Sequence, residues 1–367
     1  MYACCMQFGR FHHIRPSFET TQEETLEWLV QAHTKAENGA KHFQEEIQEK
    51  FSRVGCKPHH IAKRGHVLND FKHLDWEQME VYRLHEERSG KNLSQRTKVF
   101  EKNVDDIFEQ YYPEGSTPPD DLIHVSCTGY ISPSGAQSIV SKRNWGATTT
   151  VTHAYHMGCY GSLPALRMGR GFLQTNKRVD IVHTEICCLH TNPSLHALDQ
   201  LVSQSLFADG FIKYSIENSF EEDHFKVINI REEIIPNSLK AMSWNVADWG
   251  FQMSLAKEVP VHITRHLPQY LERLCLGKIQ DAIFAVHPGG PKILHYVQER
   301  LQLSDIQMKH SFGVLHDFGN MSSATLPHIW ERILRDEEIP NQTPIISLAF
   351  GPGLTIAGSS MVKVCGS

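Results

Sequence analysis

The sequence predicts an α/β fold, for three reasons. Short apolar runs of strand length recur along the chain, at Leu122–Val125, Val179–Val182, Ala282–Val286 and Ile345–Phe350. Amphipathic stretches with helical spacing lie between them, for example at Ile293, Leu294, Val297 and Leu301. Turn-forming residues separate such segments, as in Pro113–Asp120. Short apolar strands that alternate with helices are typical of α/β proteins.

The N-terminal part of the chain is expected to be mainly helical. The first 20 residues show no clear pattern, and we expect irregular structure there. Thr21 and Glu24 have the spacing of a capping box, which predicts the start of a helix. A charged, helix-rich region then extends to about Gln110. The polar stretch Glu217–Asp223 indicates a boundary between two halves, residues 1–217 and 218–367.

The composition argues against several classes of protein. Of the 367 residues, 40% are apolar and 21% charged, as in ordinary globular proteins. The net charge of −6 argues against nucleic acid or an anionic membrane as the main partner. No apolar run approaches the roughly 18 residues of a membrane span, and the N-terminus does not resemble a secretory signal. Nine cysteines, an odd number spread thinly, suit a reducing cytosol, so we expect a cytoplasmic protein.

Cys159, in the segment Met157–Gly161, is a candidate nucleophile. It follows a Thr-rich apolar run and precedes an amphipathic stretch, which predicts a strand-to-helix junction. The positive end of a helix dipole lowers the pKa of a thiol and favours the thiolate. Gly158 would permit a strained backbone at this point. The alternative is a buried structural cysteine.

His287, in Val286–Pro291, is a candidate catalytic residue. It directly follows a predicted strand and precedes a rigid Pro-Gly-Gly turn, so it would lie at the edge of the sheet where open α/β folds bind ligands. Pro291 can start the next helix. The alternative is a histidine that caps the turn.

Asn320, in Phe318–Ala324, is a candidate oxyanion-binding residue. Its side-chain amide can donate to an enolate or thioester oxygen, although an asparagine N-cap is an alternative. Together, Cys159, His287 and Asn320 could divide the work of thioester chemistry. The thiolate would take an acyl group while the other two polarise a second thioester that loses CO2.

Six motifs occur in a characteristic order. They are CTGYISPSG (Cys127–Gly135), GCYG (Gly158–Gly161), SLFADG (Ser205–Gly210), HPGGPKIL (His287–Leu294), FGNMSSA (Phe318–Ala324) and AFGPGLT (Ala349–Thr355). From about Lys50 onward, the chain resembles the chalcone-synthase-like type III polyketide synthases of the thiolase superfamily. The resemblance implies a five-layered αβαβα fold of two similar halves, a homodimer, coenzyme A thioesters as substrates, and no cofactor.

The resemblance also implies roles for particular residues. Cys159 matches the acyl-carrying nucleophile of the family, and His287 and Asn320 match its decarboxylation pair. Phe207 matches a gatekeeper at the tunnel mouth and Phe251 a second one, and Ser322 matches a serine beside the catalytic asparagine. Glu185 lies in the segment Glu185–His190, which we expect to line the cavity. Lys50, Arg53 and Lys57 lie in the region that holds the coenzyme A phosphates, although a solvated helix face is an alternative.

Several positions depart from the chalcone-forming pattern. Threonines of those members are replaced by Cys187 and His190. A methionine lent to the partner's cavity corresponds to Ser132, and a cavity-opening glycine corresponds approximately to Met242. The cavity should therefore differ, and the chain is more similar to bacterial members that make alkylpyrones or alkylresorcinols from fatty acyl starters.

Three other interpretations remain open. His183, Cys187, Cys188 and His190 could suggest a metal site, as could Cys4, Cys5, His12 and His13, but neither group has the paired spacing of structural zinc. On a strand, Cys187 and Cys188 would also point to opposite faces. An initiating β-ketoacyl carrier-protein synthase would share the fold and the Cys-His-Asn set but perform one condensation. A degenerate, acyl-binding partner subunit is the non-enzymatic alternative.

Overall fold

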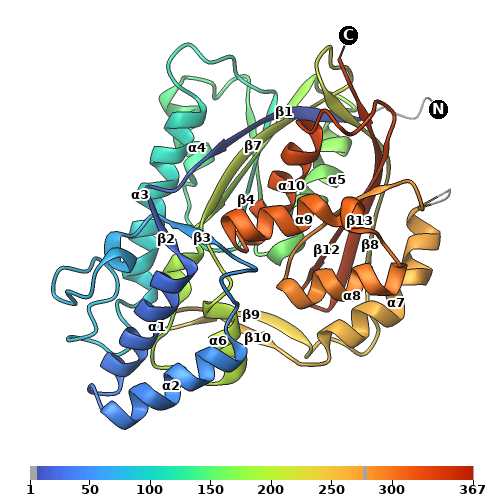
Figure 1. Ribbon diagram of the computed structural model, residues 1–367. Helices are drawn as coiled ribbons and strands as arrows, with labels where there is room; N and C mark the ends of the chain where they lie inside the picture. The colour runs from blue at the N-terminus through green and yellow to red at the C-terminus, as the bar shows by residue number, and fades with distance from the viewer. Residues whose placement is uncertain (1–5, 276–278, 367) are drawn as a thin grey trace.

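The computed structural model describes residues 6–275 and 279–366 as a mixed α/β structure (Figure 1). Its strands are β1 (Gln7–Ile14), β2 (Phe18–Thr21), β3 (Lys63–His66), β4 (Asp121–Ser126), β5 (Thr150–Tyr155), β6 (Arg178–Glu185), β7 (Gly210–Glu217), β8 (His224–Ile234), β9 (Met242–Ala247), β10 (Gly250–Leu255), β11 (Ile283–Val286), β12 (Pro344–Gly351) and β13 (Thr355–Val364). Its helices are α1 (Gln22–Ala36), α2 (Lys41–Val54), α3 (Leu93–Tyr111), α4 (Gly135–Lys142), α5 (Ser162–Phe172), α6 (Leu198–Gln204), α7 (Val259–Leu274), α8 (Pro291–Leu301), α9 (Asp305–Phe318) and α10 (Thr325–Leu334). Short 3₁₀ turns are η1 (Asn69–Lys72), η2 (Gly158–Tyr160), η3 (Cys187–His190) and η4 (Ser322–Ala324).

The four apolar runs become the strands β4, β6, β11 and β12, as the sequence predicts. The capping box at Thr21 and Glu24 also forms, and Pro291 is the first residue of α8. The apolar positions Leu294 and Val297 are the buried residues of α8. These elements are specified by local patterns of burial, capping and turn chemistry.

The expectation that the first 20 residues are irregular is wrong. They contain β1, which pairs antiparallel with both β7 and β8 and so joins two groups of strands into a sheet ordered β11-β12-β13-β8-β1-β7-β6-β4-β5. The ladder is interrupted by a register shift between Gly9 and His12, where Arg10 has a φ of 55°. The partners of β1 lie some 200 residues away, so no local pattern reveals the pairing.

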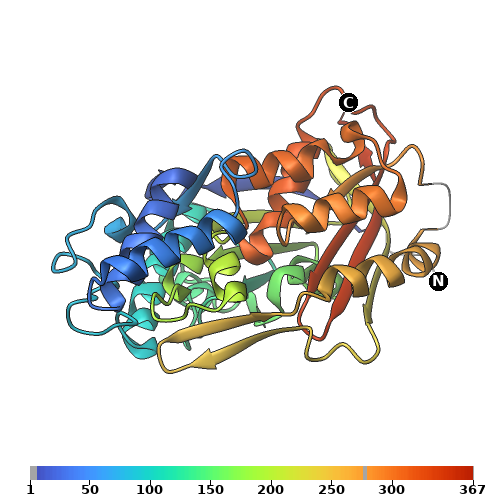
Figure 2. The same cartoon turned by 60° about the horizontal axis from the view of Figure 1, so that its bottom comes forward.

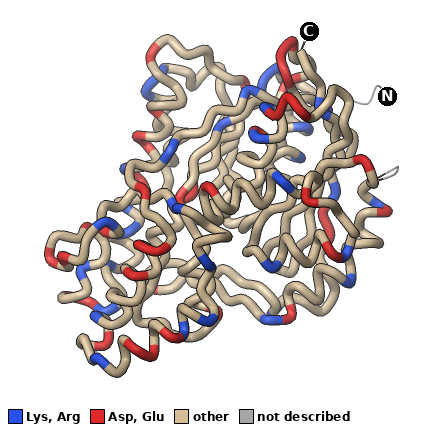
Figure 3. The backbone as a smooth tube through the Cα atoms, viewed as in Figure 1, with Lys and Arg blue, Asp and Glu red and all other residues tan. Residues whose placement is uncertain are grey.

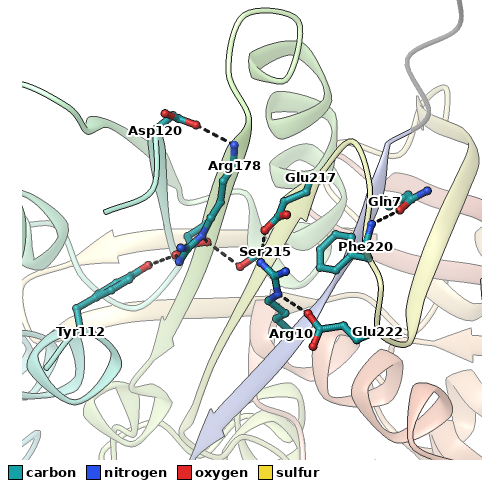
Figure 4. Close-up of polar contacts among 10 residues, drawn as sticks. Gln7, Arg10, Tyr112, Asp120, Arg178, Ser215, Glu217, Phe220 and Glu222 are labelled. Carbon is teal, nitrogen blue, oxygen red and sulfur yellow. Dashed lines mark hydrogen bonds and ion pairs between the residues drawn. The ribbon is translucent and has the colours of Figure 1, made fainter. Parts of the chain in front are cut away.

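Polar contacts tie the segment between β7 and β8 to β1 (Figure 4). Arg10 forms ion pairs with Glu217 and Glu222, and Gln7 Oε1 accepts the backbone N–H of Phe220 at 2.8 Å. These contacts connect the segment between β7 and β8 to β1.

The helices α5 and α10 occupy the middle of the molecule (Figure 1). Helix α5 contacts β4, β6 and β7 on one side and β13 on the other, and α10 contacts β1, β7 and β11. Every residue of α10 except Arg332 is buried. Helix α10 is therefore almost completely enclosed, whereas α5 exposes Arg167 and Gly171.

The carboxyl ends of three neighbouring strands define one edge of the sheet. β4 pairs parallel with both β5 and β6, so their carboxyl ends meet. Cys127, Cys159 and Cys187 lie in the loops that follow these three strands. The hairpin β9–β10 runs from the C-terminal half along α6 and covers this edge (Figure 2).

Charges of both signs are interspersed over the described residues (Figure 3). No helix among them is long and apolar enough to cross a membrane.

Candidate active site

Cys159 lies on η2, between β5 and α5, as the sequence predicts. Gly158 adopts a φ of 78°, and a Cβ at this position would lie 2.6 Å from Pro352 Cδ. Glycine is therefore required for two reasons, the left-handed backbone and the close approach of the Gly-Pro-Gly turn. This tight turn aims Cys159 into the cavity beside it.

A mainly apolar cavity with a free volume of about 50 Å³ lies against Cys159. The cavity is lined by Arg64, His66, Phe71, Cys127, Thr128, Gly158, Cys159, Cys187, Cys188, His190, Thr191, Gln200, Ser203, Gln204, Phe207, Met242, Trp244, Met253, Ser322 and Pro352. Phe207, His190, Met242 and Ser322, which the sequence singled out, thus all lie on its wall.

The expectation of a lowered thiol pKa at Cys159 is wrong for this buried position. Burial raises the pKa of the Cys159 thiol to about 12, the hydrogen bond to Ser322 opposes this increase, and the carboxyl group of Glu185 adds to it. Cys159 is only 8% exposed, so desolvation of the thiolate outweighs the favourable end of a short helix. At this pKa, the Cys159 side chain is a neutral thiol at neutral pH.

Ser322 connects Cys159 to Asn320. The Sγ of Cys159 lies 3.9 Å from Ser322 Oγ, and Asn320 Oδ1 accepts the backbone N–H of Ser322 at 2.9 Å. Because Oδ1 is occupied by this bond, the orientation of the amide is set and its NH₂ group is turned away from Ser322. Asn320 also forms an isolated bridge with Phe207, which brings Phe207 and this loop together.

His287 follows β11 and is buried, at 1% exposure. Neither ring nitrogen has a hydrogen-bond partner among the described residues, and burial lowers the pKa of His287 to about 3. Gly290 of the same turn lies against Leu206, whose carbonyl accepts the backbone N–H of Asn320 at 3.0 Å. The loops of His287 and Asn320 therefore meet at Leu206, although neither side chain forms part of the cavity wall around Cys159.

His190 holds the β9–β10 hairpin in place. Its Nδ1 accepts the backbone N–H of Phe251 at 3.0 Å, so its Nε2–H donates to the carbonyl oxygen of Thr128 at 2.8 Å. Trp244 of the same hairpin donates its indole N–H to the carbonyl of Cys127 at 2.7 Å. Both polar atoms of His190 are used, so only its ring face is available to a substrate.

Phe251 does not line the cavity, because its ring stacks on His190 with centroids 4.5 Å apart. The residues of the hairpin that line the cavity are Met242, Trp244 and Met253. Trp244 and Met253 are not among the residues that the sequence singled out. The period-2 alternation of a strand could have indicated that Trp244 shares a face with Met242, but only the hairpin's position shows that this face meets the cavity.

Glu185 is fully buried beneath the cavity. Its carboxylate accepts hydrogen bonds from the backbone N–H of Cys127, at 3.0 Å, from Thr128 Oγ1, at 2.9 Å, and from the Ser323 hydroxyl. Burial raises the pKa of Glu185 and these bonds oppose the increase. Glu185 thus joins the loops that carry Cys127 and Ser322, and acts by positioning them rather than by touching the cavity.

Comparisons with known proteins show the family of the chain. Residues 17–216 match the N-terminal domain of chalcone and stilbene synthases, and residues 226–365 match the C-terminal domain. The chain belongs to the chalcone and stilbene synthase family. The match begins at residue 17, well before the start at about Lys50 that the motifs indicated.

One relative is Probable polyketide synthase 1 of Dictyostelium discoideum, 28% identical over 257 residues. The aligned part covers 66% of this chain but only 8% of that much longer protein. The C-terminal type III polyketide synthase domain of Steely1, a type I/III hybrid from Dictyostelium, superposes with a TM-score of 0.81 at 21% identity, covering 99% of both chains.

Two further structures are similar. PKS-I of the brown alga Ectocarpus siliculosus has a TM-score of 0.79 at 18% identity, covering 99% of this chain and 98% of the other. 1,3,6,8-Tetrahydroxynaphthalene synthase of Streptomyces coelicolor A3(2) has a TM-score of 0.80 at 20% identity, covering 98% of this chain and 99% of the other. At these identities the likeness concerns the fold, and it confirms the expected thiolase-like architecture.

The remaining positions singled out by the resemblance to the family lie at the surface. Ser132 is exposed, on a loop next to the exposed Tyr130. Lys50 and Arg53 are on α2, where Lys50 pairs with Glu46 at 2.6 Å, and Lys57 follows the helix. Next to Lys57, Cys56 donates its backbone N–H to Ser205 Oγ at 2.9 Å, which places this basic segment beside α6 and the cavity.

The histidines and cysteines considered as metal ligands have other contacts. Cys187 and Cys188 lie on η3 and both line the cavity. The prediction that they point to opposite faces of a strand is therefore wrong. His183 contacts Ser323 Oγ at 3.0 Å, and His13 pairs with Glu331 at 2.7 Å. Cys4 and Cys5 lie outside the described residues. Within those residues, no three such side chains are arranged to hold a metal ion.

Proposed function

We propose that this chain is an iterative type III polyketide synthase that loads an acyl starter onto Cys159 and extends it with malonyl-CoA. The observation that carries the proposal is the position of the Cys159 thiol. It lies on the wall of an apolar cavity and is joined through Ser322, 3.9 Å away, to Asn320. The starter would arrive as an acyl-CoA or on an acyl-carrier protein.

In the proposed cycle, Sγ of Cys159 loses its proton as it attacks the carbonyl carbon of the starter, the bond from that carbon to the carrier sulfur breaks, and the carrier leaves as a thiol after it takes up one proton. A malonyl-CoA then loses CO₂, and its thioester oxygen takes the negative charge of the resulting enolate. Neutral His287 has one N–H, and neither of its nitrogens has a hydrogen-bond partner within residues 6–275 and 279–366, so that N–H is available to this oxygen together with the amide of Asn320. The enolate carbon attacks the Cys159 thioester and releases the thiolate for the next round.

We propose an aliphatic starter and a pyrone or resorcinol product. The cavity is mainly apolar, and Met242, Met253 and Trp244 occupy its hairpin side. Methionine adapts to flexible alkyl chains better than to a flat hydroxylated ring. Because the free volume is only about 50 Å³, a long chain would enter only when these methionines change rotamer. Starter length should therefore depend on the hairpin.

The proposal includes a homodimer and no metal or prosthetic group. An exposed aromatic residue, Tyr130, borders the loop of Ser132, which in the family faces the partner's cavity. Sedimentation velocity should give twice the chain mass, and activity should persist in chelator. A monomer that is fully active, or one bound metal lost together with activity, would contradict this part.

Intact-protein mass spectrometry tests the function. Hexanoyl-CoA should acylate the parent once, and added malonyl-CoA should extend the adduct and release a cyclic product. Cys159→Ala should lose the adduct while retaining some decarboxylation of malonyl-CoA, because the two steps use different residues. Cys188→Ala, which removes another cavity thiol, should still be acylated.

The same assay separates the alternatives. A single extension that requires malonyl-carrier protein would favour the initiating β-ketoacyl synthase. Acyl binding without an adduct or CO₂ release would favour the non-catalytic partner subunit. An adduct that persists in Cys159→Ala would overturn the assignment of the nucleophile.

A further inference from the structure

Arg64 places an incompletely paired cation in the wall of the cavity. Its side chain is 2% exposed, and its Nη1 donates to the carbonyl oxygens of Gln204 and Phe207 at 2.8 and 2.9 Å. Its Nε and Nη2 have no hydrogen-bond partner among the described residues. The nearby carboxylate of Asp209 already accepts the backbone N–H groups of Val67 and Cys188, each at 2.8 Å.

The unpaired N–H groups of Arg64 lower the stability of the folded protein unless a ligand accepts hydrogen bonds from them. Burial lowers the pKa of Arg64 to about 10, so the guanidinium remains charged at neutral pH. Leaving N–H groups of a buried cation without acceptors is unfavourable, by more than for a neutral donor. Donors in this state on a cavity wall are suited to a ligand oxygen.

His66, two residues along β3, has a tautomer that its neighbours determine. Thr25 donates its hydroxyl to the carbonyl of Thr21 at 2.9 Å, so in the 2.7 Å contact between Thr20 and Thr25 the donor must be Thr20. Thr20 therefore accepts at 2.8 Å from His66, whose Nε2 carries the hydrogen.

The other nitrogen of His66 is consequently a free acceptor. Burial holds the pKa of His66 well below its usual range, so the ring is neutral and Nδ1 carries a lone pair. Nδ1 has no partner among the described residues, although the ring is only 1% exposed and stacks on Phe71. His66, Phe71 and Arg64 all line the cavity.

We propose that Arg64 and His66 form a subsite for an enolised 1,3-dicarbonyl unit of the polyketide chain. This proposal rests on the proposed function. The carbonyl oxygen of such a unit accepts from Arg64, and its enol O–H donates to His66 Nδ1. A carboxylate satisfies only Arg64 and leaves the His66 lone pair facing a negative charge, and an isolated ketone supplies no donor. The pair positions the chain and so influences which carbonyl takes part in ring closure.

The first test uses the parent protein and acetylacetone, a 1,3-diketone with a stable enol. Calorimetry should detect binding that is at least fivefold tighter than that of 2-pentanone or acetate. Acetylacetone should also slow the alkylation of Cys159 by iodoacetamide. Equal affinity for the three compounds, or tighter binding of acetate, would overturn the proposal. This result does not depend on turnover, so it stands apart from a failure of the proposed condensation.

The second test uses two matched variants. The amide of glutamine reaches the position of Nε2 and can keep the bond to Thr20, whereas the amide of asparagine reaches the position of Nδ1. His66→Gln should weaken acetylacetone binding about fivefold and raise the ratio of linear to cyclic product with hexanoyl-CoA and malonyl-CoA. His66→Asn should stay within twofold of the parent. If His66→Asn weakened acetylacetone binding more than His66→Gln, His66 would only anchor β3 to Thr20. Unchanged acetylacetone binding in both variants would also overturn the proposed subsite.

Discussion

The imidazole of His190 stacks on the ring of Phe251, with the planes 7° apart, and also accepts the backbone N–H of that residue at 3.0 Å. His190 lies on η3, which follows β6. Its side chain thereby fixes the position of the β9–β10 hairpin, which belongs to the C-terminal part of the chain. Since this hairpin supplies Met242, Trp244 and Met253 to the cavity, His190 controls the shape of the cavity without offering a polar atom to it.

Replacing His190 should therefore loosen the hairpin. In His190→Leu, the N–H of Phe251 and the carbonyl of Thr128 lose their partners, and each buried unsatisfied group costs about 1–3 kcal/mol. For the two groups together, we expect unfolding in urea to show a loss of about 2–6 kcal/mol in the free energy of unfolding. We also expect the variant to accept a broader range of acyl-CoAs. His190→Asn can retain the bond to Phe251 and should lose less. Equal stability of His190→Leu and the parent would contradict the anchoring role.

The protein should lose stability in mild acid. Burial lowers the pKa values of His190 and His287 to about 3, so the folded chain holds fewer protons on them than the unfolded chain. The stabilisation from these neutral rings is fully present above the unfolded pKa of about 6.5 and declines as the pH falls towards 3. The thermal midpoint, measured by circular dichroism from pH 7 to 5, should decrease steadily. A midpoint that rises over this interval would contradict the burial of neutral histidines.

The reactivity of Cys159 should depend steeply on pH. Because its thiol pKa is raised to about 12, the thiolate fraction, and with it the rate of iodoacetamide alkylation, should rise about tenfold per pH unit between pH 7 and 10. Ser322→Ala removes a hydrogen bond that favours the thiolate and should slow alkylation, whereas Ser322→Thr keeps a hydroxyl. Peptide mapping by mass spectrometry gives the rate at this residue. A plateau near neutral pH would instead indicate an activated thiolate.

His287→Ala and Asn320→Ala should separate loading from decarboxylation. Acylation of Cys159 should continue in both variants, while CO₂ release from malonyl-CoA falls by roughly 10²–10³, the usual effect of losing one oxyanion donor. Isotopically labelled malonyl-CoA provides the measurement, and acylated-enzyme mass provides the control. Unchanged CO₂ release in both variants would mean that the pair is assigned incorrectly.

Met242→Gly should shift starter choice towards aromatic acyl groups. The parent should have a higher kcat/KM for octanoyl-CoA than for p-coumaroyl-CoA, and the variant should narrow the difference because it opens space on the hairpin side. Met242 is a better choice for substitution than Trp244, because the indole N–H of Trp244 also donates to the carbonyl of Cys127. A tenfold preference of the parent for p-coumaroyl-CoA, about 1.4 kcal/mol in transition-state binding, would refute the aliphatic assignment.

Local sequence determined much of the framework. The apolar runs that become β4, β6, β11 and β12, the capping box at Thr21 and the left-handed glycine before Cys159 are each specified by a few adjacent residues. The ordered motifs around Cys159, His287 and Asn320 indicated the family, which the domain matches then confirmed. Catalytic candidates are visible in this way because each requires a particular residue type next to a particular turn.

Only the tertiary structure decided the features that depend on distant partners. β1 is a strand because β7 and β8 flank it, and Phe251 packs on His190 while Met253 reaches the cavity because the hairpin crosses from the other half. The thiol pKa of Cys159, and the free donors and acceptor of Arg64 and His66, follow from burial and from hydrogen bonds to remote residues. A linear pattern specifies which side chains are present and how they alternate, but desolvation and hydrogen-bond satisfaction depend on every group that the folded chain brings within a few ångströms.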